Sequence, residues 1–338
     1  MVTIKDIARE CNVAVSTVSR ALADSKLIPE STRKRIQENA KNMGYIPNSL
    51  AKQLRTKQTR SIGVFSFVGK HLGFSHYLFS KVLDSFMHEA CNYDYDIVLL
   101  SENLLKNNEN LVNYCKSRNL EGVLVLCGDL KEKPLQELIS SVIPVVVIDG
   151  FDLNLSMATY CISSNNREMM FNLTEHVISM GHKDIVFITG NEQFYVTHER
   201  KQGFLSALKY HGIQFRDEML VSGSYYDLNE IDKHLRAVLS RKNLPSCILL
   251  PDDYSAVRVY TLLQEYGLQI GKNISLTGYD GLEFAEQLTP RLTTVEQNTK
   301  QIGILAAQTF IKVSKGEEVP FMQLVKSKLF IGESVYKI

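Results

Sequence analysis

The first 45 residues place apolar side chains at the spacing of short helices. Apolar positions recur three to four residues apart over 4–11, 15–22 and 36–43, which is the period of an amphipathic helix. Thr3 can cap the first helix, and Gly44 can end the third. Three short helices with a tight turn between the first two predict a helix-turn-helix unit, whose second helix enters the major groove of DNA.

From residue 62 onward the pattern changes to short apolar runs that alternate with helical stretches. Continuous apolar strands separated by helices predict parallel sheets that are covered on both faces. The series repeats after residue 160, which predicts two Rossmann-like lobes with a ligand cleft at the carboxyl ends of their strands. The expected strands lie at 62–67, 96–100, 122–126, 144–148, 184–188, 246–250 and 274–278.

Composition narrows the class of protein. The chain has 338 residues, of which 44% are hydrophobic and 22% charged, as in ordinary globular domains. The apolar runs are far shorter than the roughly 20 residues that a membrane helix needs. The N-terminal residues 1–10 lack the apolar core of a secretory signal. We therefore expect a cytoplasmic protein with no membrane partner.

The charge is unevenly distributed along the chain. Residues 1–60 carry 12 basic and five acidic side chains, a net charge of +7, whereas the remainder carries 26 basic and 32 acidic ones, a net charge of −6. A small basic unit on a larger acidic body indicates a module that binds a polyanion, joined to a part with another task.

Signatures of catalysis or metal binding are missing from the sequence. The six cysteines include no C-x-x-C pair and the eight histidines do not cluster, which disfavours a zinc site. There is also no G-x-x-x-x-G-K-[ST], G-x-S-x-G or H-E-x-x-H motif. We expect no cofactor, no metal and no catalytic residue, and hence no enzyme.

Four sequence blocks of the basic unit resemble one family. They are T-I-K-D-I-A from Thr3, S-T-V-S-R-A-L from Ser16, S-T-R-K-R-I from Ser31 and M-G-Y-I-P-N-S-L-A-K-Q-L-R-T from Met43. In this order they resemble the N-terminus of LacI/GalR-family transcription regulators. The resemblance continues through S-L-T-G-Y-D-G from Ser275 and beyond, so it spans essentially the whole chain.

The resemblance, together with the strand pattern, implies an α/β fold: an N-terminal helix-turn-helix domain plus a two-lobed, periplasmic-binding-protein-like core of two Rossmann-like parallel sheets. We expect the DNA-binding domain at 1–46, a hinge helix and linker at 47–60, and an effector-binding and dimerisation core at 61–338. Within the core, lobe 1 is expected at about 61–160 and 292–320, and lobe 2 at about 161–291 and 321–338.

The resemblance also assigns candidate DNA contacts by position. Its groove contacts fall on Val15, Ser16 and Arg20, although Val15 could instead be a core residue. An apolar side chain at Val15 could meet a thymine methyl group. The remaining positions resemble phosphate, base or backbone contacts: Thr3, Thr17, Ser19, Thr32, Tyr45 and Asn48.

Two positions depart from the family pattern. Ala14 stands where the family usually has Ser at the start of the recognition helix, and Pro29 replaces the usual cap before the third helix. Neither side chain can cap, and a missing cap typically costs about 1 kcal/mol.

The segment after Pro47 resembles the family's hinge helix. By position, Leu54 would wedge between base pairs in the minor groove, and the small Ala51 would allow close approach. The alternative for Leu54 is an ordinary buried linker residue. A helix of about two turns is too short to be stable alone in water, so the resemblance implies that the hinge folds on DNA.

Candidate ligand residues follow from the expected strand ends. Asp149, Asp252 and Asp280 each come directly after an apolar strand. Carboxylates accept hydrogen bonds from neighbouring hydroxyl groups, and Arg200 can donate two in a fork, which suits a saccharide. Arg200 and Asp280 could alternatively form a purely structural ion pair.

The resemblance supports Arg200 and adds three more ligand candidates. Arg200 stands where the family has its ligand-binding arginine, and Tyr225 where it has an aromatic residue that stacks on the ligand. Phe79 is the comparable aromatic residue of the first lobe, and Asn165 replaces the family's common Asp.

These features predict a dimeric, effector-controlled regulator, most simply a repressor of a carbohydrate operon. Its partners would be palindromic double-stranded operator DNA, a saccharide effector (a sugar or sugar phosphate) in the cleft between the lobes, and a second copy of the chain. The alternatives are a regulator that answers to a protein corepressor or a purine, or, in a different class, a sugar-binding transport protein or a cleft enzyme.

Overall fold

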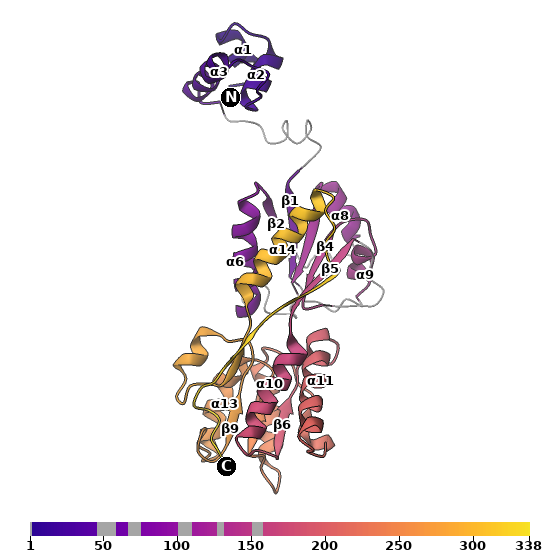
Figure 1. Cartoon of the computed structure of the whole chain (residues 1–338), viewed down its shortest axis with the longest axis vertical. Helices are drawn as coiled ribbons and strands as arrows, with labels where there is room; N and C mark the ends of the chain where they lie inside the picture. Colours follow the sequence, from indigo (N-terminus) through magenta and orange to yellow (C-terminus); the bar gives the residue numbers. More distant parts are fainter. Residues whose placement is uncertain (1, 46–58, 67–75, 101–109, 127–131, 151–157) are drawn as a thin grey trace. The chain divides into compact units, whose positions relative to one another are not determined.

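A computed structural model describes residues 2–45, 59–66, 76–100, 110–126, 132–150 and 158–338. The chain divides into two compact units, Met1–Thr59 and Arg60–Ile338, and many of their elements are labelled in Figure 1. We call the first unit the head and the second the core. The head contains α1 (Ile4–Glu10), α2 (Val15–Leu22) and α3 (Glu30–Asn42).

The ends of the head helices follow the expected capping. Thr3 and Asp6 form a capping box, because the Thr3 side chain accepts from the Asp6 amide and the Asp6 carboxylate accepts from the Thr3 amide at 2.9 Å. Neither Ala14 nor Pro29 makes a side-chain cap. Gly44 follows α3 with a φ of +69°, a conformation that glycine adopts without strain.

Lobe 1 of the core is built on a six-stranded parallel sheet in the order β11-β5-β4-β3-β1-β2. Its strands are β1 (Ser61–Ser66), β2 (Asp96–Leu100), β3 (Gly122–Leu126), β4 (Val145–Ile148), β5 (Thr159–Ser164) and β11 (Met322–Val325). Its helices are α6 (Tyr77–Cys91), α8 (Leu111–Ser117), α9 (Lys133–Ile139) and α14 (Thr299–Ser314).

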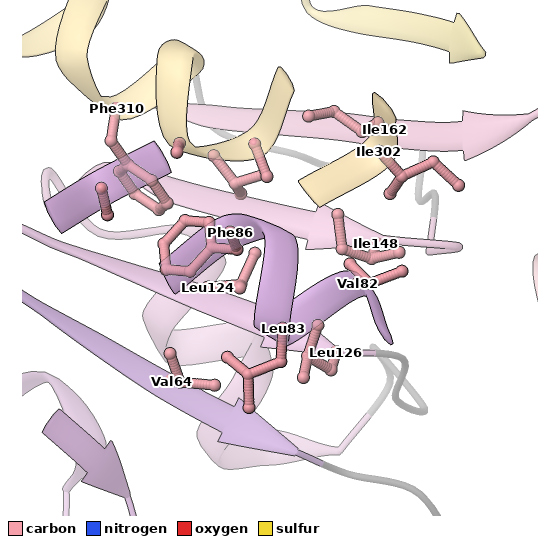
Figure 2. Packing of buried hydrophobic residues seen from close by; sticks show 14 of the residues in the cluster. Val64, Val82, Leu83, Phe86, Leu124, Leu126, Ile148, Ile162, Ile302 and Phe310 are labelled. Carbon is pink, nitrogen blue, oxygen red and sulfur yellow. The ribbon is translucent and has the colours of Figure 1, made fainter. Parts of the chain in front are cut away.

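The two faces of this sheet have separate cores. On one face α6 and α14 lie side by side, and Phe86 and Phe310 meet edge to face with ring centres 6.1 Å apart, above Leu124 and Ile148 (Figure 2). On the other face Val123 and its neighbours pack against α8 and α9. Alternate residues of each strand therefore enter different cores, which accounts for the uninterrupted apolar runs.

Lobe 2 has a four-stranded parallel sheet in the order β7-β6-β8-β9, with a separate antiparallel pair of β10 and β12. The strands are β6 (Ile185–Ile188), β7 (Leu220–Val221), β8 (Cys247–Leu249), β9 (Ser275–Thr277), β10 (Thr294–Glu296) and β12 (Lys328–Phe330). The helical segments are α10 (Asn166–Ser179), α11 (Tyr195–Tyr210), η2 (Asp217–Met219), α12 (Leu228–Leu239), α13 (Asp253–Glu265) and η3 (Glu283–Gln287).

The lobe boundaries differ from those expected at 160, 292 and 321. Most of β5 and all of β11 fall within the ranges expected for lobe 2, but the two strands pair with each other within the lobe 1 sheet. Conversely, Val295 of β10 packs in a lobe 2 core. Neither β5 nor β11 was among the expected strands, so no predicted element marked this part of the lobe 1 sheet. The chain therefore crosses between the lobes near residues 165, 297 and 327.

Candidate functional site

The recognition helix α2 presents a polar surface on one side and core residues on the other. Val18 and Ala21 are fully buried in the core of the head, whereas Ser16 and Arg20 are exposed. Val15 is 41% exposed, so the alternative that it is a core residue does not hold. An exposed apolar residue beside polar and basic ones is the kind of surface that reads base edges in the major groove.

The basic residues of the head fall into two groups. Arg33 and Arg35 bond to groups of the head: Arg33 Nε lies 2.8 Å from the Asp24 carboxylate, and the Arg35 guanidinium donates to the Cys11 carbonyl oxygen at 3.3 Å. Arg20, in contrast, makes no ion pair within the described part of the chain. Its charge is therefore available to an external anion.

The other candidate DNA residues of the head have differing exposure. Thr3 is exposed, but its hydroxyl group takes part in the capping box. Thr17, Ser19 and Thr32 are half-buried, and Tyr45 packs against the core of the head. The hinge candidates Asn48, Ala51 and Leu54 lie outside the described residues.

In the core, Arg200 is the centre of a buried polar cluster. It projects from α11 and is 3% exposed. Its Nε donates to Asn166 Oδ1 and its Nη1 to the Pro251 carbonyl oxygen, both at 2.8 Å. The guanidinium lies over the ring of Tyr279, 3.6 Å from the ring centre. Asp280 is a weaker neighbour, 3.9 Å from Nη2, which leaves Nη2 able to donate to a ligand.

A hydrogen-bond chain connects Arg200 to the first lobe. Asp149 follows β4 with a φ of +57° and accepts from the Ser163 hydroxyl group at 2.6 Å. Asn166 then donates to the Ser163 oxygen at 3.1 Å and accepts from Arg200. Burial raises the pKa of Asp149, and hydrogen bonding from Ser163 and the charge of Arg200 oppose this effect. Asp149 and Arg200 therefore belong to one site.

A second chain starts at Asp280, after β9. One carboxylate oxygen accepts from the Tyr226 hydroxyl group at 2.6 Å, and the other accepts from Gln297 Nε2 at 2.8 Å. Gln297 Oε1 in turn accepts from the Ser164 hydroxyl group at 2.5 Å. Burial raises the pKa of Asp280 to about 7, against the opposing charge of Arg200. Both chains thus pass through residues at the crossings between the lobes.

Two further ligand candidates, Tyr225 and Asp252, already make contacts within the protein. Tyr225 lies over Gly190, where a Cβ atom would overlap its ring, and its ring centre is 5.5 Å from the Arg200 guanidinium carbon. Asp252 caps α13, with its oxygens accepting from the Ser255 and Tyr226 amides at 2.7 and 2.9 Å.

The contacts of Asn165 and Phe79 differ from the ligand contacts that were expected of them. Asn165 donates to Glu168 at 2.7 Å and accepts from the Ser327 amide at 2.9 Å, so it joins two crossings between the lobes. Phe79 is 5% exposed and belongs to the lobe 1 core. Its neighbour His76 does contact lobe 2, with its ring centre 3.8 Å from that of Tyr226.

Sequence reasoning missed several members of this cluster. Tyr226 and Asn166 directly follow the candidates Tyr225 and Asn165. Gln297 ends the stretch L-T-P-R-L-T-T-V-E-Q, which also resembles the family, so all three were adjacent to recognised signals. His76 and Ser163 carry no local signal, because their roles depend on contacts with Tyr226 and Asp149, which lie in other segments of the chain.

The described residues contain no group of three or more His, Cys, Asp or Glu side chains that could hold a metal ion. Among the helices of the described segments, none has the length and apolarity to cross a membrane. Within the same segments the cysteines are free thiols, and Cys91 alone of them is exposed.

Comparison with known proteins identifies both parts of the chain. Residues 3–48 match the family of bacterial regulatory proteins, lacI family, and residues 174–335 match the periplasmic binding protein-like domain. The probable HTH-type transcriptional repressor ExuR of Bacillus subtilis (strain 168) is 31% identical over 340 residues, covering 100% of this chain and 99% of that protein. Catabolite control protein A of Priestia megaterium is 28% identical and covers 94% of each.

Among solved structures, the lac repressor dimer bound to operator and the anti-inducer ONPF has a TM-score of 0.83 at 21% identity, with 99% of each chain covered. The helix-turn-helix head and the two-lobed core thus define a DNA-binding transcription regulator. The chain belongs to the lacI family of bacterial regulatory proteins.

Proposed function

We propose that this regulator is a homodimer that represses a carbohydrate operon by binding a palindromic operator. In each copy α2 enters the major groove with Val15, Ser16 and Arg20 directed at base edges. The segment 47–60 acts as the hinge, with Asn48 on the DNA backbone, and Ala51 and Leu54 enter the minor groove. The exposed polar side of α2, with its unpaired Arg20, is the observation that supports the DNA-binding role.

We further propose that the effector is a saccharide, either neutral or acidic, held by Arg200, Asp280, Asp149 and Tyr225. Buried carboxylates and a guanidinium with a free donor suit the hydroxyl and carboxylate groups of a sugar. The ring of Tyr225 offers an apolar face to a pyranose.

The two hydrogen-bond chains would couple effector binding to the arrangement of the two lobes. Ser163, Ser164, Asn166 and Gln297 connect the polar cluster to the crossings between the lobes. An effector that binds Arg200 and Asp280 more tightly in one lobe arrangement shifts the population toward it, and operator affinity changes by the same coupling.

Two linked experiments test this function. The first selects operators from a random DNA pool with the full-length protein; a palindromic consensus is expected, and the absence of sequence selection would refute operator recognition.

The second measures the thermal stability and the operator affinity of the protein with glucose, galactose, ribose, glucuronate, glucose 6-phosphate, adenine and guanine. A saccharide effector should raise the Tm and change operator affinity, whereas a response to purines alone would overturn the carbohydrate assignment.

A further inference from the structure

Tyr226 occupies an unusual position in the core. It lies in the segment between β7 and α12, is 7% exposed, and has a φ of +54°. Aromatic residues rarely adopt a positive φ, and such strain persists only where the surroundings determine the conformation. The contacts of Tyr226 therefore need an explanation.

The contacts of Tyr226 fall on residues of the proposed effector site. Its amide donates to Asp252 at 2.9 Å, and its hydroxyl group donates to Asp280 at 2.6 Å. Its ring contacts two other rings: His76 of lobe 1, with centres 3.8 Å apart, and Tyr254 of lobe 2, stacked at 5.5 Å with an angle of 11°. A ring that carries a hydroxyl group is thus already bound to the carboxylate expected to receive the hydroxyl group of a ligand.

The contact between the rings of Tyr226 and His76 connects the two lobes. The start of α6 supplies further contacts across the lobes: Tyr77 lies 5.9 Å from Tyr254 and 6.1 Å from Phe284, measured between ring centres. Lys81 pairs with Glu283 at 2.7 Å. The Tyr77 and Lys81 contacts are largely exposed, whereas that of Tyr226 with His76 is buried and attached to the polar cluster.

His76 is suited to this buried contact because it carries no charge at neutral pH. Burial lowers the pKa of His76 to about 3, and its ring also lies 4.4 Å from Phe79 of the lobe 1 core. A neutral imidazole can stack on Tyr226 without the cost of a buried charge.

We propose that Tyr226 is an internal competitor of the effector, which holds the lobes together by occupying Asp280, Asp252 and His76 until a ligand displaces it. This inference rests on the proposed effector site and adds a residue that sets the affinity of that site. A ligand that needs Asp280 binds only molecules in which Tyr226 has moved away, so its apparent affinity is reduced by the fraction of such molecules.

The test compares full-length Tyr226→Phe and Tyr226→Ala with a matched control, Tyr260→Phe. Tyr260 also lies in lobe 2, and its hydroxyl group donates to the Pro290 carbonyl oxygen at 2.6 Å, so the control removes a similar hydrogen bond from outside the site. Tyr226→Phe keeps the ring in place, so the test remains valid if the alanine variant misfolds. Circular dichroism verifies the folding of each variant.

The first measurement is the distance between the lobes without ligand, by double electron–electron resonance. Spin labels are placed on Lys116→Cys in α8 and Lys233→Cys in α12, two exposed positions, with Cys91 and Cys127 replaced by Ser. An excess of unlabelled protein ensures one labelled chain per assembly. Longer or broader distances are expected for Tyr226→Ala, a smaller change for Tyr226→Phe, and none for Tyr260→Phe. Unchanged distances in both Tyr226 variants would overturn the proposal.

The second measurement is the affinity for the compounds of the panel above, by calorimetry. Tyr226→Phe should bind the responsive compound about fivefold more tightly, as expected for the loss of one competing hydrogen bond. Weaker binding would show that Tyr226 is part of the ligand site and not its competitor. If no compound binds even the wild type, the proposed effector class fails, and the lobe distances still decide the role of Tyr226.

Discussion

The guanidinium of Arg200 lies 3.6 Å from the centre of the Tyr279 ring, and both side chains are buried. A planar cation on an aromatic face is a favourable arrangement that Lys cannot reproduce with the same geometry. Together with its bonds to Asn166 and the Pro251 carbonyl, this contact makes Arg200 a structural residue as well as a candidate ligand contact.

Arg200→Ala should therefore affect both stability and the effector response. Removing one partner of a buried charged network typically costs about 3–5 kcal/mol, and urea unfolding of the core should show a loss of this order. Arg200→Lys keeps the charge but loses the fork, so it should bind the effector poorly at a smaller stability cost. Operator binding at low temperature should survive in both variants. Wild-type ligand affinity in Arg200→Lys, measured by calorimetry, would mean that the pocket lies elsewhere.

The head offers an independent test of helix capping. Ala14 precedes α2 without a side-chain cap, although its φ of −67° and ψ of 149° are those of a capping residue. Ala14→Ser should stabilise the head by about 1 kcal/mol, and Thr3→Ala, which breaks the capping box, should destabilise it by a similar amount. Thermal unfolding of a fragment of residues 1–59, which contains the complete core of the head, measures both. A loss of stability in Ala14→Ser would mean that the hydroxyl group cannot reach the free amides.

The contributions of Val15 and Arg20 to operator recognition can be measured separately. Arg20→Ala should lose about 1–3 kcal/mol of discrimination at one base position if the side chain reads a base. Val15→Ala should change the preferred base at one position while leaving non-specific affinity unchanged. Arg9→Ala removes the same charge from an exposed site on α1 and serves as the control. Affinity for the selected operator and its single-base variants, at two salt concentrations, separates these effects. A uniform loss across all sequences in Arg20→Ala would make it a phosphate contact.

Much of the fold and part of the site could be predicted from local patterns. Apolar runs predicted seven of the described strands. The ligand cleft was expected at the carboxyl ends of the strands of both lobes, so Asp149 and Asp280 were both expected to face it. The structure does bring both to Arg200. The burial of Phe79 was also foreseeable, because Leu78, Phe79, Val82 and Phe86 share helical spacing on α6.

Other features depend on contacts that no local pattern records. β5, with the sequence T-Y-C-I-S-S, lacks a continuous apolar run, and only its pairing with β4 and β11 assigns it to lobe 1. The role of Tyr226 depends on His76, which is 150 residues away in sequence. Gln297 gains its role from lying at a crossing, between Ser164 and Asp280.

The buried Asp280 predicts a specific dependence of stability on pH. Burial raises its pKa from 3.8 to about 7, with Arg200 opposing the shift and Asp252 adding to it, while Tyr226 and Gln297 donate to its oxygens. The folded state therefore holds a proton that the unfolded state has released, between about pH 4 and pH 7. Stability contributed by the protonated form is lost as the pH rises through this window.

Asp280→Asn should remove this part of the pH dependence. The amide cannot ionise, so the variant should not lose stability as the pH rises from 5 to 8. The Tm of the variant minus that of the wild type should therefore increase by about 3 °C or more between pH 5 and pH 8. The other buried carboxylates, Asp149, Asp252 and Asp253, remain in both proteins, so the difference between the two isolates Asp280. Asp217→Asn, an exposed position in the same lobe, is the control and should show the same offset at both pH values. Scanning calorimetry of the core transition provides the measurement. A constant offset for Asp280→Asn would mean that Asp280 is already ionised at pH 5, held in that state by Arg200.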